Sequence, residues 1–257
     1  MVPKLLTSDQ LEGANEKLKR ANENILNLNS EGLVFFDNSD YPTIPHEDEK
    51  VFQEAVDYHS KRGIPLRFSI LAGEIIHHLR SILDHIALQL SSTTARGTHA
   101  IANQIEFPIF AKRPITKDEM SRYSRKVQGI SDAKALTLIE SLQPYNRLPT
   151  DDPLDVPIWI IYDLDRIDKH RELVLVFFTL HINLTSELIF KATLLNQKAK
   201  RAGEPSPTIG KAVQMYGKAS PQISFSQFGK SEKQPIIPAL THLANTTRDV
   251  VRLFAAL

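Results

Sequence analysis

The segment AGEIIHHLRSILDHIALQL, residues 72–90, sets the architecture of this chain. At about 100° per residue, a helix over these residues gathers its large apolar side chains on one face: Ile75, Ile76, Leu79, Ile82, Leu83, Ile86 and Leu90. This face spans about 160° of the helix circumference, which is more than a surface helix needs. We therefore predict that residues 73–90 form the central helix of the fold.

Composition sets the broad class of the protein. The chain has 257 residues, 42% of them hydrophobic, so it can bury a core without disulfides or structural metals. It has no cysteine, which excludes thiolate metal sites and cysteine nucleophiles and fits a cytoplasmic location. Because 31 basic side chains are balanced by 30 acidic ones, a nucleic-acid partner must be bound by a local patch. No apolar run reaches the roughly 18 residues of a membrane span, so we expect no membrane partner.

The remaining segments predict a mainly α (α+β) fold, a helical bundle with a small antiparallel β-sheet in the C-terminal half. Apolar spacing and capping signals favour helices at residues 8–28, 47–59, 116–124, 131–142 and 158–172. The apolar run at 32–37 fits a strand or a connector, and residues 91–97 fit a loop. We expect one α-rich domain over 1–257. Its parts are a helical core at about 47–172, a β-containing segment at about 173–230 with strands near 173–182, 212–216 and 222–228, and a C-terminal helix at about 238–257.

The polar face of the 73–90 helix is the first candidate site. It carries groups that bind metals, phosphates or protons: Glu74, His77, His78, Ser81, Asp84 and His85, with Arg80 at its edge. Glu74, His78 and His85 lie within about 40° of one another on the helix, which suits one ligand or metal. The structural alternative is a local Arg80–Asp84 ion pair, with imidazoles that hold neighbouring helices in register.

A second polar segment, DLDRIDKHR at residues 163–171, offers partners for that face. Asp163 and His170 are seven residues apart and share a helix face, which allows an oriented imidazole. The other charges pair at spacings of three or four and are typical of a solvated face. Because imidazoles on a partly buried face need partners, we predict that the two segments lie adjacent. We expect Asp163 or Asp168 within hydrogen-bond reach of an imidazole or of Arg80 on the 73–90 helix.

Several familiar sites are absent from the sequence. There is no Gly-rich phosphate loop followed by Lys-Ser/Thr, no GxGxxG and no GxSxG. The predicted strands and helices do not alternate, so we expect neither a doubly wound fold nor a nucleotide cofactor. Aromatic residues make up 7% of the chain and are not interleaved with basic ones, so the sequence does not predict an RNA-stacking platform.

Two resemblances extend this interpretation. Arg80-Ser-Ile-Leu-Asp-His85, with four residues between arginine and histidine, resembles the motif of the HEPN superfamily, helical-bundle domains common in bacterial toxin and phage-defence systems. Four ordered segments between about residues 65 and 175 also resemble a family of bacterial proteins without an assigned activity. These segments are GEIIHHLRSILDHIALQL, FPIF at 107–110, LQPY at 142–145 and DRIDKHREL.

The HEPN resemblance implies metal-independent RNA cleavage by residues that meet across a homodimer interface. It implies that Arg80 stabilises the phosphorane charge and that His85 acts as general base or acid on the ribose 2′-hydroxyl. Asp84 and His170, from the two polar segments, complete the candidate catalytic set. Ser81 follows the arginine where those families favour an amide, an acid or a histidine, and Arg80 and His85 lie about 140° apart on an ideal helix.

Three functions are consistent with these residues. The first is a metal-independent ribonuclease with RNA as partner and no cofactor. The second is a metal-binding helical-bundle hydrolase that uses a divalent metal, with His78, Glu74 and Asp163 as candidate ligands. The third is a non-catalytic interaction module, in which the polar face holds helices in register or binds a partner.

Overall fold

A computed structural model describes residues 5–37, 64–146, 152–170, 176–183, 218–232 and 234–256. This part of the chain is mainly helical, with short strands only in its C-terminal half, so the predicted mainly α fold is confirmed. None of the described helices combines the length and the apolar run needed to cross a bilayer.

The described elements follow in this order along the chain. The helices are α1 (Ser8–Asp37), α3 (Leu66–Leu90), α4 (Thr93–Gly97), α5 (His99–Ala102), α6 (Lys117–Lys126), α7 (Ala133–Ser141), α8 (Pro157–His170) and α11 (Ile236–Ala256). Two 3₁₀ turns, η1 (Pro144–Asn146) and η2 (Pro153–Asp155), precede α8. The strands are β1 (Val176–Asn183), β2 (Lys218–Phe225), β3 (Gln227–Phe228) and β4 (Ser231–Glu232).

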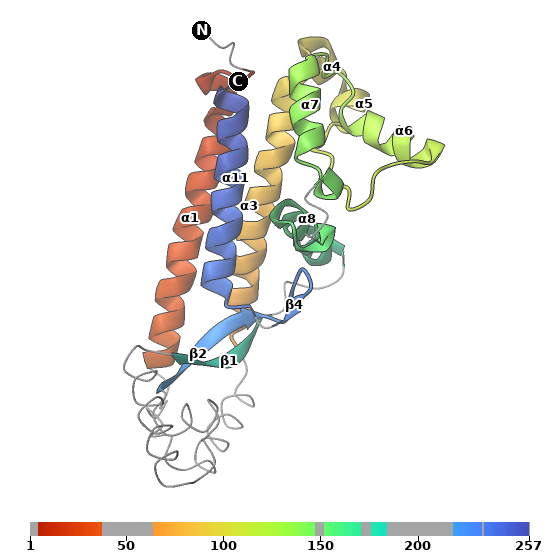
Figure 1. Cartoon of the computed structure of the whole chain (residues 1–257). Coiled ribbons are helices and arrows are strands. Elements are labelled where there is room, and N and C mark those ends of the chain that lie inside the picture. Colours follow the sequence, from red (N-terminus) through yellow and green to blue (C-terminus); the bar gives the residue numbers. More distant parts are fainter. Residues whose placement is uncertain are drawn as a thin grey trace, which may run out of the picture. The chain divides into compact units, whose positions relative to one another are not determined.

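Helix α3 is the centre of the first compact unit, which comprises residues 1–29, 66–175 and 225–257. Helices α8 and α11 pack against α3 and against each other, and α1 runs along α3 and α11 (Figure 1). The predicted apolar face of α3 is buried as far as Ile86, while Leu90 at the end of the helix is partly exposed. The members without exposed surface are Ile75, Ile76, Leu79, Ile82, Leu83 and Ile86. The prediction of a central helix is therefore confirmed.

Polar contacts join the first part of α1 to α3. Lys17 Nζ donates to Ser81 Oγ at 2.7 Å, and Asn24 Nδ2 donates to an oxygen of Glu74 at 3.4 Å. Gly13 faces the ring of His85, and a Cβ at this position would lie 3.2 Å from the ring. A glycine that lowers the helix propensity of α1 thus leaves room for an imidazole between the two helices.

An extended segment, residues 105–110, links the short helices that follow α3 to helix α6. The side chain of Gln143, which is fully buried after α7, holds this segment from one side. Gln143 Nε2 donates to the Pro108 carbonyl at 2.7 Å, and Gln143 Oε1 accepts the Phe110 N–H at 3.2 Å. Helix α6 then begins with a capping box between Thr116 and Glu119.

The second compact unit comprises residues 30–65 and 176–224. Its described part contains the end of α1 and the paired strands β1 and β2. The first unit has its own small antiparallel hairpin, in which Gln227 of β3 lies opposite Glu232 of β4. The predicted single domain and its internal boundaries stay a prediction.

Two local predictions are wrong. Residues 32–37 form neither a strand nor a connector, because α1 continues to Asp37. Leu28, Gly32 and Phe35 continue the inward spacing of that helix, which a six-residue window does not reveal. Residues 93–97 form a helical turn rather than a loop, since the Ser92 hydroxyl caps the Ala95 N–H at 3.2 Å. The helix predicted at 47–59 and the strand at 212–216 lie outside the described residues.

Gly129 provides a test of how this region is packed. Its φ is +86°, and a Cβ there would lie 2.5 Å from the Cβ of Ala95, while its carbonyl accepts the Ser92 N–H at 2.8 Å. Gly129→Ala should therefore lower the free energy of unfolding by about 2–4 kcal/mol, through the left-handed backbone and the overlap. Urea unfolding measures this change. The matched substitution Gly97→Ala meets no atom within 4 Å and should be neutral or stabilising. Equal effects of the two substitutions would contradict the packing.

Candidate functional site

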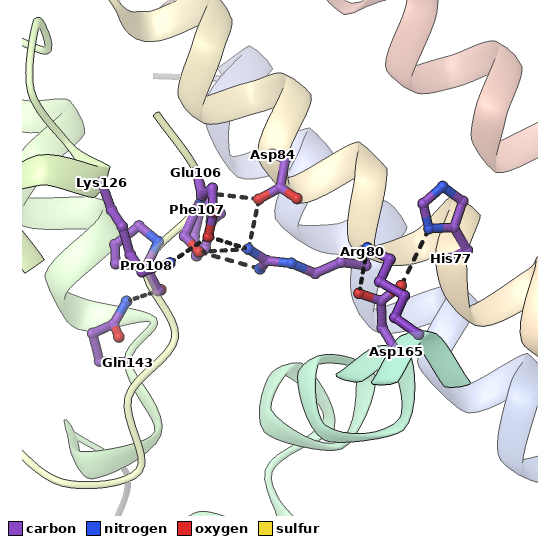
Figure 2. A network of polar contacts seen from close by, with 10 residues as sticks. His77, Arg80, Asp84, Glu106, Phe107, Pro108, Lys126, Gln143 and Asp165 are labelled. Carbon is purple, nitrogen blue, oxygen red and sulfur yellow. Dashed lines mark hydrogen bonds and ion pairs between the residues drawn. The ribbon is translucent and has the colours of Figure 1, made fainter. Parts of the chain in front are cut away.

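Arg80 lies at the centre of a buried polar network. Its side chain is only 5% exposed, and its two terminal nitrogens both donate to the Phe107 carbonyl at 3.1 Å (Figure 2). The same guanidinium forms an ion pair with Asp84 at 2.7 Å and approaches Glu106 at 3.6 Å. It also lies over the ring of Tyr162, 5.7 Å from the ring centroid. Arg80 is thus surrounded by partners from its own chain.

Asp84 also bonds to the backbone of the extended 105–110 segment. Its Oδ1 accepts the Phe107 N–H at 3.0 Å, so Arg80 and Asp84 together bind both backbone polar groups of Phe107. Burial raises the pKa of the Asp84 carboxyl above its usual value, while the Arg80 guanidinium and the Phe107 N–H act in the opposite direction. The predicted Arg80–Asp84 pair is therefore present, and it bonds to the segment that follows α5.

The predicted catalytic pair does not come together within this chain. Arg80 faces the 105–110 segment and α8, whereas His85 faces α1, where its Nε2 lies 3.3 Å from the Gln10 carbonyl. The two positions lie about 140° apart on the helix, so the two side chains point to different neighbours and do not converge. His170 is the last residue of α8 and its side chain lies outside the described residues. Its catalytic role stays a prediction.

The predicted adjacency of the two polar segments is confirmed. The carboxylate that reaches an imidazole of α3 is that of Asp165, and Asp168 lies against Gly73 of the same helix. His77 Nδ1 lies 3.2 Å from Asp165 Oδ1, and Lys169 binds the other Asp165 oxygen at 2.9 Å. Asp165 is 8% exposed, so the assumption that it belongs to a solvated face was wrong. Asp163 bonds instead to Arg166 at 2.6 Å, one turn further along α8.

The predicted metal ligands are spread over different contacts. Glu74 and His78 are on the side of α3 that meets α1, while Asp163 pairs with its neighbour on α8. Across the described ranges, no group of three His, Asp or Glu side chains is arranged to hold a metal ion. His78 is half-buried, and its Nδ1 has no hydrogen-bond partner among the described residues.

A broad cleft of about 700 Å³ opens between α6, the 103–112 segment and α8. Its lining combines cations, rings, amides and two carboxylates: Asn103, Gln104, Glu106, Ile109, Phe110, Ala111, Lys112, Glu119, Arg122, Arg125, Lys126, Trp159 and Tyr162. Lys126 is bonded to Glu106. Lys112, Arg122 and Arg125 are exposed and make no ion pair or hydrogen bond with other described residues.

Aromatic side chains of α8 lie beside these cations. The rings of Trp159 and Tyr162 are 5.3 Å apart and tilted by 48°, and both line the cleft. The chain has no other tryptophan. Sequence reasoning missed this site because the basic residues of α6 and the rings of α8 are more than 30 positions apart, so no local window shows them interleaved. The only local signal is the RYSRK run at 122–126, which a solvated helix explains equally well.

Comparisons with known proteins add no further constraint. No protein-family model, curated protein or solved structure matches this chain. The buried network around Arg80 and the cleft between α6 and α8 are therefore the features that bear on function.

The structural role of Arg80 can be measured. Arg80→Leu leaves Asp84 and Glu106 without their shared cation and the Phe107 carbonyl without its donors. The free energy of unfolding should fall by about 3 kcal/mol. Arg20→Leu is the matched control, because Arg20 is exposed and its one ion-pair partner among the described residues is Glu23, at 3.4 Å. The control should change stability by less than about 1 kcal/mol. An equally small change in Arg80→Leu would contradict a stabilising role for the buried network around Arg80.

His78 should make stability depend on pH. Burial, followed by the charges of Lys17 and His77, lowers the pKa of His78 below its ordinary value of 6.5, and Glu74 only partly offsets this. Protonating His78 therefore costs more free energy in the folded than in the unfolded state. The stability that neutral His78 contributes is fully present above pH 6.5 and is lost as the pH falls through the pKa of the folded state. The urea midpoints of wild type and His78→Gln should be measured above and below pH 6.5. The difference between the two proteins should change with pH only below pH 6.5. An NMR titration of His78 with a midpoint above 6.5 would contradict this.

Proposed function

We propose that this protein is a non-catalytic module that binds single-stranded RNA in the cleft between α6 and α8. The observation that carries the proposal is the combination of unpaired cations and aromatic rings in one open cleft. Single-strand binders combine a basic groove for the backbone with rings on which bases stack. A free strand has exposed base faces, which a duplex lacks.

The charges suit a short, local contact with a phosphate backbone. Arg122 and Arg125 are one helical turn apart on α6, and Lys112 comes from the facing segment. The whole chain has a formal net charge of +1, so the net charge of the protein contributes little attraction to a phosphate backbone. Binding should therefore be weak to moderate and should depend on this cleft alone.

Binding without cleavage is favoured by the state of Arg80. A residue that stabilises a phosphorane must reach the reacting phosphate, and Arg80 is buried with its nitrogens directed at Phe107 and Asp84. His85 is directed at α1. The ribonuclease hypothesis with Arg80, Asp84, His85 and His170 needs those contacts to be exchanged for new ones across a dimer. The interaction-module alternative needs no such change.

Fluorescence anisotropy of a labelled single-stranded oligoribonucleotide tests the proposal. Three unpaired cations predict a slope of about −2 for the logarithm of the binding constant against the logarithm of salt concentration, at about −0.7 per phosphate. The double variant Arg122→Gln with Arg125→Gln should weaken binding by about tenfold or more. It should also make the slope less negative by about 1.4. The RNA should be recovered intact.

The matched control is Lys117→Gln with Lys134→Gln. It removes the same charge from exposed positions on α6 and α7 that do not line the cleft. This pair should retain the affinity within about twofold and leave the slope unchanged. Equal losses in both double variants would assign binding to net charge and contradict a specific cleft. Cleavage abolished by His85→Ala would instead support the ribonuclease.

A further inference from the structure

Glu106 places its carboxylate in the lining of the cleft, close to two cations. Its carboxylate is bonded to Lys126 Nζ and lies 3.6 Å from the Arg80 guanidinium, so it stands between two cations. It is nevertheless 44% exposed and lines the cleft. The backbone of Glu106 is fixed, since its N–H donates to the Lys126 carbonyl at 3.1 Å.

Arg80 has partners in the buried network besides this carboxylate. Its guanidinium binds the Asp84 carboxylate at 2.7 Å and the Phe107 carbonyl at 3.1 Å. Lys126, by contrast, has Glu106 as its ion-pair partner among the described residues. The side chain can therefore move away from Lys126 while its backbone, Arg80 and the wall of the cleft stay in place.

We propose that the Glu106 carboxylate is a resident anion in a phosphate subsite, and that this subsite selects strands ending in a phosphomonoester. This inference rests on the proposed RNA-binding function and specifies which end of the ligand the cleft recognises. A phosphodiester inside a strand carries one negative charge, the same as the carboxylate it would have to displace. A terminal phosphomonoester carries about −1.5 to −2 at neutral pH and has more acceptor oxygens. It therefore competes better for Lys126 and for the field of Arg80.

Glu119 provides the matched control. It also lines the cleft and carries the same charge, but its carboxylate accepts the N–H groups of Ile115 and Thr116. It acts on Arg122 through charge and forms no ion pair with a cation among the described residues. Glutamine at either position keeps the shape and removes one negative charge. Only Glu106→Gln also breaks an ion pair with a lysine, so the difference in strand preference between the variants isolates the subsite.

The experiment compares two oligoribonucleotides of the same sequence, one with a 5′-phosphate and one with a 5′-hydroxyl, on wild type, Glu106→Gln and Glu119→Gln. Wild type should bind the phosphorylated strand about fivefold more tightly. Glu106→Gln should bind the hydroxyl strand about fivefold more tightly than wild type does, which reduces the preference. Glu119→Gln changes the field at Arg122 for both strands alike, so it should raise both affinities by the same factor and keep the wild-type preference.

Each outcome decides between the two proposals. If wild type binds both strands equally and loses both in Arg122→Gln with Arg125→Gln, the terminal-phosphate subsite is wrong and RNA binding stands. An equal reduction of the strand preference in Glu119→Gln and Glu106→Gln would also overturn the subsite. If neither strand binds to wild type or to any variant, both proposals fail.

Discussion

The bond between the Arg80 guanidinium and the Phe107 backbone is the contact on which the rest of the arrangement depends. Residues 105–110 form no helix or sheet, so their polar backbone groups must find partners elsewhere when buried. Arg80 and Asp84 satisfy the carbonyl and the N–H of Phe107 from α3, and Gln143 does the same for Pro108 and Phe110 from the end of α7. An irregular segment is thus fixed from both sides, and one wall of the cleft stands opposite α8.

This distribution of contacts explains how a helix face rich in functional groups need not form one site. Arg80 and Asp84 bond to the 105–110 segment, His77 to α8, and Ser81 and His85 to α1. The polar side chains are divided among three neighbours because α3 is surrounded on most sides. The groups that remain available for a ligand are on α6 and α8 instead, where cations and rings have few partners of their own.

The sequence predicts those features that depend on local periodicity and capping. The apolar face of α3, the start of α6 near Thr116 and the C-terminal helix all follow from spacing or from single capping residues. The partners of polar residues cannot be predicted in this way. Asp163, Asp165 and Asp168 have equivalent local signals, and only the rotation of α8 against α3 brings Asp165 to His77. The cleft depends on long-range packing for the same reason, because Arg122 and Trp159 line one cleft only after the intervening segment has folded back.

Hydrogen exchange of the Phe107 amide tests the central claim most directly, namely that the Arg80–Asp84 pair builds the wall of the cleft and is not free for chemistry. The account predicts that this N–H, although outside any helix or strand, exchanges as slowly as the core amides of α3. Exchange of the Phe107 amide as fast as that of exposed amides, such as Lys112, would contradict the bond between Asp84 and the Phe107 N–H. Arg80 would then be available for another role.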